Sequence, residues 1–234
     1  TGLGYYLNYA VDYFAILYEY YKNTGDLEFV KEIYPFAKKV VARVCRVDGV
    51  NTDGNFIVRA VRRVRKVIWK IKGKNVDNLH GKLFPRMTQK RSEYVDGLID
   101  KGSYFAYLTN GLKNHLEISK IMGDKDEELR TLRYIKKFTK ETKKYMDEAG
   151  FVIRKVPGDK EAVCTYTGLT SAHLAGIIDS ETFKKNFKAL LDGERKSAYP
   201  MNGMAKFWII KSAYESGDPQ ICIDFIRKEW GVLI

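Results

Sequence analysis

The chain has 234 residues, of which 45% are hydrophobic, and it carries a net charge of +12. This length and apolar content allow a full hydrophobic core and exclude an intrinsically disordered chain. No apolar run approaches the roughly 18 residues of a membrane span, and no signal-peptide pattern opens the sequence. We therefore expect a cytoplasmic protein that makes no contact with a membrane.

The sequence contains three Gly-Asp pairs between apolar-periodic stretches, at Gly25-Asp26, Gly123-Asp124 and Gly217-Asp218. Each pair ends one apolar-periodic stretch and opens the next. Glycine can adopt the left-handed conformation that closes a helix without a Cβ penalty. The following aspartate can accept hydrogen bonds from the N–H groups that open the next helix. Each pair therefore predicts the tight corner of an antiparallel helical hairpin.

Apolar residues at spacings of three and four predict eight helices arranged as four hairpins. In each hairpin a mostly apolar helix comes first and a more charged, amphipathic helix second, which indicates an inner and an outer helix. The predicted helices span 3–23 and 26–46, 103–122 and 125–147, 165–177 and 180–192, and 201–216 and 219–230. Pro35 lies inside the second helix and predicts a kink or a separate first segment. The fold class is therefore all-α, with antiparallel helical hairpins forming an α/α toroid.

The segment 47–102 interrupts this pattern with a basic block. Between Arg59 and Lys74 lie eight lysines and arginines and no acid. The spacing of the apolar residues there fits a basic amphipathic helix, and the valine and isoleucine content of Phe56–Ile71 also fits β-structure. We expect one domain over residues 1–234, with an irregular basic insertion at about 47–102.

Several stretches resemble the catalytic domain of α-L-rhamnosidases and related six-hairpin (α/α)6-barrel glycoside hydrolases, in the order of that family and over about two-thirds of the chain. The first hairpin is similar to the family's Asp-Trp, Tyr-Tyr and Thr-Gly-Asp pattern. Gly97 to Asp100 resembles its Phe-Ile-Asp-Trp, with Lys101 where tryptophan is expected. The matching residues are Asp12-Tyr13, Tyr20-Tyr21, Thr24-Gly25-Asp26, Glu32 to Pro35, Gly97 to Asp100, Ile118 to Gly123, Ala213 to Gly217 and Ile226 to Gly231.

The resemblance implies a carbohydrate-active domain that hydrolyses a terminal glycosidic bond by an inverting, two-carboxylate mechanism. The family's general acid lies in an Asp-Glu-Arg motif, and its general base lies in a Thr-Thr-x-Trp-Glu motif that follows the closing Trp-Gly. Neither motif occurs here, and the chain as given ends at Ile234. The resemblance therefore indicates the C-terminal portion of a barrel, about four of six hairpins, with its catalytic carboxylates unassigned.

Long links between hairpins fall at one end of an antiparallel stack, where binding residues usually lie. Near the predicted inner-helix starts at this end are carboxylates that could bind sugar hydroxyls and tyrosines that could stack on sugar rings. The candidate substrate-binding residues are Asp12, Tyr9, Tyr13, Asp100, Tyr104 and Tyr166. The alternative for Asp100 is a helix cap, and the alternative for the tyrosines is core packing.

The sequence gives no support for a metal or nucleotide cofactor. His80, His115 and His173 show no metal-ligand spacing, and no phosphate-binding glycine loop is present. The three cysteines, Cys45, Cys164 and Cys222, lie in apolar contexts that predict buried thiols.

Two alternatives to a carbohydrate-active domain remain open. The first is a helical scaffold that binds nucleic acid or another polyanion through residues 59–74, whose affinity would fall steeply with salt. The second is a helical-repeat interaction protein, which the unequal hairpin lengths disfavour. The sequence does not determine the oligomeric state.

Overall fold

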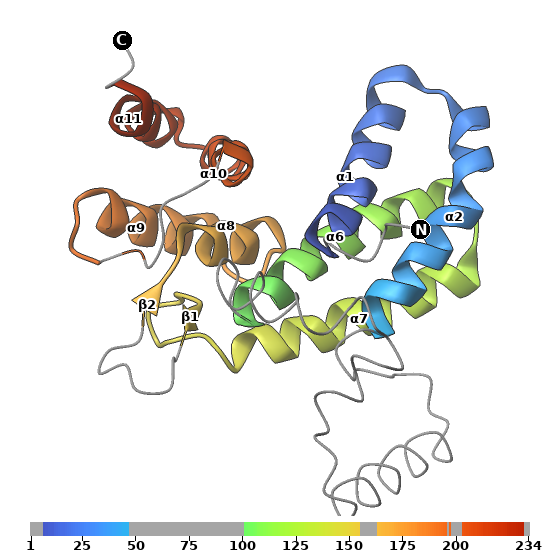
Figure 1. The fold of residues 1–234 in the computed structure, drawn as a ribbon, viewed down its shortest axis with the longest axis horizontal. Coiled ribbons are helices and arrows are strands. Elements are labelled where there is room, and N and C mark those ends of the chain that lie inside the picture. Colours follow the sequence, from blue (N-terminus) through green and yellow to red (C-terminus); the bar gives the residue numbers. More distant parts are fainter. Residues whose placement is uncertain (1–6, 47–100, 155–162, 196, 198–202, 232–234) are drawn as a thin grey trace, which may run out of the picture.

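In the part of the chain that the computed structural model describes, four antiparallel helical hairpins follow one another in chain order (Figure 1). The structure describes residues 7–46, 101–154, 163–195, 197 and 203–231. The hairpins are α1 (Leu7–Thr24) with α2 (Leu27–Arg46), α6 (Lys101–Ile121) with α7 (Lys125–Lys143), α8 (Tyr166–Leu174) with α9 (Ser180–Leu191), and α10 (Gly203–Glu215) with α11 (Pro219–Trp230). The predicted all-α hairpin fold is confirmed. The basic insertion lies outside the described residues.

The Gly-Asp corners have the predicted geometry. The glycines adopt positive φ angles of 68° at Gly25, 65° at Gly123 and 82° at Gly217. The aspartates that follow them accept hydrogen bonds from backbone N–H groups of the next helix, those of Phe29, Glu127, Gln220 and Ile221. The corner between α8 and α9 also contains a glycine with positive φ and a capping aspartate, but the two residues are not adjacent in sequence. Gly176 has a φ of 63°, and Asp179 accepts from Thr182 N–H at 2.7 Å.

The first helix of each hairpin forms an inner row, and the second helix covers it. Helix α6 packs against α1 and α8, and α8 packs against α10, while α2, α7, α9 and α11 each pack on their own hairpin partner. The starts of α6 and α8 meet, because the hydroxyl oxygens of Ser103 and Thr165 lie 3.4 Å apart. These two inner helices therefore run in the same direction, with their first turns at the end that carries the long links.

Among the described residues, the core consists of two clusters along this row. The first lies between α1, α2, α6 and α7 and contains Phe14, Leu108 and Phe138, all buried. The second lies mainly among the last two hairpins and contains Phe183, Phe187 and Phe225. All three cysteines are buried, as the sequence predicts.

Two features differ from the predictions. Helix α2 is continuous through Pro35, so the predicted separate first segment is wrong. Pro35 is exposed, so water can solvate the carbonyl that its missing N–H leaves without a helical partner. The predicted helix 125–147 ends at Lys143, and a turn closed by Asp147 follows it. This turn leads to a short antiparallel ribbon of β1 (Ile153–Arg154) and β2 (Val163–Cys164) within a segment that the sequence suggests is a loop.

Gly111 lies where α1 crosses α6, and we expect Gly111→Ala to destabilise the fold by about 1–3 kcal/mol through overpacking. A Cβ at Gly111 would lie 2.3 Å from Val11 Cγ1 and 3.1 Å from the Val11 carbonyl oxygen, so the two helices would have to separate. Urea unfolding measures the loss. Gly231→Ala is the matched control, because a Cβ there meets nothing within 4 Å, and equal stability of the two variants would contradict the packing.

Candidate functional site

Three inner helices bring a carboxylate and two aromatic side chains together. Asp12 lies on α1, Tyr107 on α6 and Trp208 on α10. The Tyr107 hydroxyl donates a hydrogen bond to Asp12 Oδ1, and the Trp208 side chain lies close enough to the same carboxyl group to lower its pKa. The rings of Tyr107 and Trp208 meet edge to face, with their centroids 6.3 Å apart. We call these three residues the Asp12 cluster.

The helices place the cluster toward the end that carries the long links. Each of the three residues lies within about two turns of the start of its helix. On α1, the neighbours Val11 and Phe14 are buried in the core, and this orientation turns Asp12 toward the space that α1 shares with α6 and α10. Parallel inner helices thus bring together residues that are about 95 positions apart in sequence.

Burial dominates the electrostatics of Asp12. Asp12 is 7% exposed, and desolvation raises its pKa, although the contacts of its carboxyl group with Tyr107 and Trp208 act in the opposite direction. Its second oxygen, Oδ2, is buried and has no closely aligned donor among the described residues. This oxygen keeps acceptor capacity that no closely aligned described donor fills, and a ligand hydroxyl could use it only by displacing side chains that cover it.

The other predicted site residues are spread over the structure. Tyr13 stands next to Asp12 and packs edge to face on Phe36, with its hydroxyl buried. Tyr104 is buried in the first core cluster, and Tyr166 is buried between Phe187 and Phe225, away from the Asp12 cluster.

Burial raises the pKa of Tyr166 to about 12, which marks it as a neutral core side chain. Asp100, the Tyr9 side chain, His80 and the basic block at 59–74 lie outside the described residues.

Tyr107 and Trp208 are not among the candidate binding residues named from the sequence. Trp208 belongs to an apolar inner helix in which every large side chain fits a packing role. Trp208 lies as many residues from the start of α10 as Asp12 lies from the start of α1. This match can be recognised only when the inner helices are aligned by their first residues.

A second polar contact joins the first and last inner helices. Lys211 of α10 forms an ion pair with Glu19 of α1 at 3.0 Å. Burial of Glu19 opposes its ionisation, but hydrogen bonds and charges from Lys211 and Lys22 outweigh burial and lower its pKa. Together with the Trp208 contact, this pair links α10 to α1 beside the Asp12 cluster.

The described histidines take part in structural contacts. His173 contacts the hydroxyls of Ser212 and Ser180 through its two ring nitrogens, at 2.7 and 3.2 Å, which links α8 with α10 and α9. His115 is fully buried and contacts Glu127 at 3.0 Å. Within the described part of the chain, no three His, Cys, Asp or Glu side chains are grouped as metal ligands.

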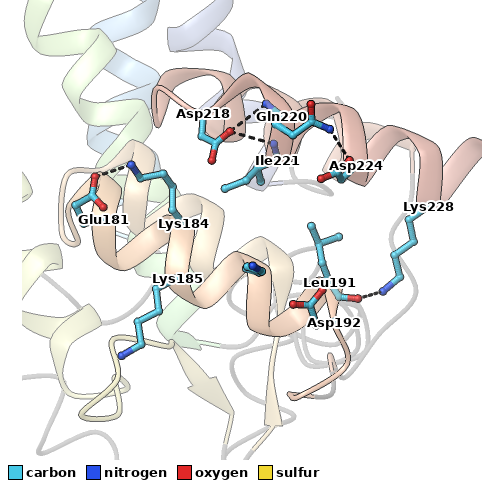
Figure 2. A pocket seen from close by; sticks show the side chains of 11 residues that line it. Glu181, Lys184, Lys185, Leu191, Asp192, Asp218, Gln220, Ile221, Asp224 and Lys228 are labelled. Carbon is cyan, nitrogen blue, oxygen red and sulfur yellow. Dashed lines mark hydrogen bonds and ion pairs between the residues drawn. The ribbon is translucent and has the colours of Figure 1, made fainter.

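A groove of about 670 Å³ lies between α9 and α11 (Figure 2), and no residue of the Asp12 cluster lines it. Its charges are balanced, because four lysines and four acids line it. Lys184 pairs with Glu181, Asp218 caps α11, and Lys228 hydrogen bonds to the Leu191 carbonyl (Figure 2). This balance gives the groove no preference for a polyanion. The lining residues are Glu181, Lys184, Lys185, Lys188, Leu191, Asp192, Asp218, Gln220, Ile221, Asp224 and Lys228.

We expect Tyr107→Phe to destabilise the fold by about 1–2 kcal/mol, because it removes the hydroxyl that solvates a buried carboxylate. Since the pKa of Asp12 is raised above 3.8, its contribution to stability is complete below pH 3.8 and is lost as pH rises through the folded-state pKa. The variant raises this pKa further, so its deficit should grow from pH 4 to pH 8 in urea unfolding. A deficit that does not change with pH would contradict the role of Tyr107.

Among the described helices, none is long and apolar enough to cross a lipid bilayer.

Comparison with known proteins supports the fold through structure rather than sequence. No family model matches the chain, and no curated protein matches it in sequence. A solved structure of a rhamnosidase from Klebsiella oxytoca with rhamnose bound is similar to this chain, with a TM-score of 0.68 and 12% sequence identity. The match covers 98% of this chain and 38% of that one, so the chain spans less than half the length of the structure it resembles. The chain has a rhamnosidase-like helical fold.

Proposed function

We propose that the chain binds a carbohydrate at the Asp12 cluster, as part of a rhamnosidase-type glycoside hydrolase barrel. The observation that carries the proposal is the buried Asp12 Oδ2, which lacks an aligned donor beside two aromatic rings. The rhamnosidase-like fold supports the choice of ligand, since the similar structure is described with rhamnose bound.

The chemistry of the cluster suits a sugar. A sugar hydroxyl can donate to the carboxylate, and the C–H face of a pyranose ring can pack on the partly exposed ring of Trp208, which is backed by the buried Tyr107. A hydrogen bond to a charged acceptor contributes about 1.5–3 kcal/mol, which is enough to orient one hydroxyl. Tyr13, which follows Asp12 on α1, is proposed to border the same ligand.

We assign Asp12 a binding role within the inverting hydrolysis that the resemblance implies. Inversion needs two carboxyl groups about 6.5–9.5 Å apart. Glu19, on the same helix, is seven residues or about 10 Å further along α1, and it is held in ion pairs with Lys211 and Lys22. Asp12 would therefore position the sugar, in a six-hairpin barrel whose acid and base stay unassigned.

A titration with L-rhamnose tests the proposal. Isothermal calorimetry of the 234-residue chain should show saturable binding at about millimolar affinity, which corresponds to about −4 kcal/mol. L-fucose, another deoxyhexose, serves as the comparison ligand for specificity. A parallel screen of aryl glycosides, with the α-L-rhamnoside first, tests cleavage. The absence of saturable binding by any monosaccharide tested would contradict the proposal.

A further inference from the structure

The first hairpin carries a second apolar face that the described residues leave uncovered. On α2, Phe29 is 39% exposed and Phe36 is 45% exposed, and on α1, Ile16 is 67% exposed and Tyr20 is 36% exposed. The partly buried Ile33 and Val40 continue the row of Phe29 and Phe36 along α2. We call these residues, with Tyr13, the outer stripe.

The outer stripe is separate from the face of α2 that packs inside. The inward face of α2 consists of buried residues at helical spacing, Val30, Tyr34, Ala37, Val41 and Val44. The outer stripe is displaced from this face by about a quarter of the helix circumference, as 100° per residue requires. Ring contacts join it across the two helices, from Tyr20 to Phe29 at 4.8 Å and from Tyr13 to Phe36 at 5.7 Å. Each ring pair joins α1 to α2, so the outer stripe spans both helices of the first hairpin.

Along α2, the charged residues beside the outer stripe are acidic before Phe36 and basic after it. Glu32 is exposed on one side of Phe36 in sequence, and Lys39 and Arg43 are exposed on the other. A second α2 helix laid antiparallel, with a two-fold axis near Phe36, would place Glu32 of one copy between Lys39 and Arg43 of the other. The symmetry would then form the contact twice.

We propose that the outer stripe is a self-association surface, on which a second copy of this chain packs its own α2 antiparallel about a two-fold axis. A stripe with acid before its centre and base after it is complementary to itself when reversed. A two-fold dimer of this kind buries the outer stripes of both copies and leaves none free for a third copy. We therefore expect a dimer and not a larger assembly. This inference rests on the outer stripe and shares only Tyr13 with the proposed sugar site, so either proposal can fail without the other.

Sedimentation equilibrium of the 234-residue chain over a concentration series tests the dimer. The wild type should dimerise, and Phe36→Asp should weaken dimerisation at least tenfold. Leu132→Asp is the matched control, because Leu132 on α7 is exposed to the same degree, 46%, and should leave the dimer intact. Circular dichroism checks that both variants are folded. A monomeric wild type, or equal effects of the two variants, would overturn the proposal.

Charge exchange tests which partner occupies the stripe. Glu32→Lys alone and the double variant Lys39→Glu, Arg43→Glu alone should each dimerise less than the wild type, because like charges then face each other. An equimolar mixture of the two variant chains should form a heterodimer, which native mass spectrometry resolves. A mixture that stays monomeric would overturn the antiparallel pairing of two copies, whatever else binds the stripe.

Discussion

Replacing Glu127 with alanine is expected to destabilise the fold by about 3 kcal/mol, because it removes the acceptor at the centre of a buried polar network. Glu127 on α7 is 3% exposed and contacts His115 on α6 at 3.0 Å and Arg130 at 2.5 Å. His115 is fully buried, with Tyr34 stacked over its ring at 5.9 Å. Without the carboxylate, the imidazole of His115 would lose its partner inside the first core cluster.

Urea unfolding at pH 7 measures this loss, and Glu117→Ala provides the control. Glu117 lies on the surface of α6 in an ion pair with Lys120, so its removal should change the free energy of unfolding by less than about 0.5 kcal/mol. A loss below about 1 kcal/mol for Glu127→Ala would show that the network does not hold α6 on α7.

The pH dependence of the same variant follows from the pKa of Glu127. Burial opposes its ionisation, but the hydrogen bonds from His115 and Arg130 together outweigh burial and lower the pKa below 4.5. A lowered folded-state pKa contributes stability that is present above pH 4.5 and is lost as pH falls through the folded-state value. The difference between the wild type and Glu127→Ala should therefore shrink in acid.

Asp12→Asn is expected to weaken binding of L-rhamnose by tenfold or more while leaving the fold at least as stable at pH 7. Asparagine keeps the shape of the side chain and can still accept from Tyr107, but it removes the charge that would strengthen the hydrogen bond to a sugar hydroxyl. Because burial raises the pKa of Asp12, its ionised form at neutral pH works against folding, and a neutral side chain avoids this cost.

Calorimetric titration and urea unfolding of this variant, done together, distinguish a binding role from a structural one. Glu117→Gln is the control carboxylate, since Glu117 pairs with Lys120 on the surface of α6 and takes no part in the Asp12 cluster or in the contact between α1 and α10. Unchanged affinity in Asp12→Asn would remove Asp12 from the site. A large loss of stability would instead show that the Asp12 cluster is a structural network.

The fold could be predicted because its determinants are local. Gly25 and Asp26 specify a left-handed residue and a helix cap through their own backbone and side chain, and helical spacing identifies the buried faces. The extent of the helix after Lys125 was harder to predict, because the turn that ends it depends on Asp147 meeting the Phe151 N–H, outside the helical pattern.

The candidate site could be predicted only in part, because it is assembled by contacts between helices. Asp12 can be identified as a candidate from the sequence, because it is a carboxylate in a tyrosine-rich apolar helix. Trp208 joins it only through the parallel packing of α1 and α10, which no local pattern encodes. Tyr166 shows the converse, because a tyrosine at an inner-helix start can equally well pack in the core, as it does between Phe187 and Phe225.

The most direct test of a sugar site at the Asp12 cluster is an NMR titration of the chain labelled with ¹⁵N-tryptophan. The three tryptophans give three indole N–H signals, and Trp208→Phe assigns the signal of interest. We predict that L-rhamnose shifts the Trp208 indole signal in a saturable manner in the wild type and not in Asp12→Asn. A Trp208 signal that stays in place at saturating rhamnose would contradict the proposed site.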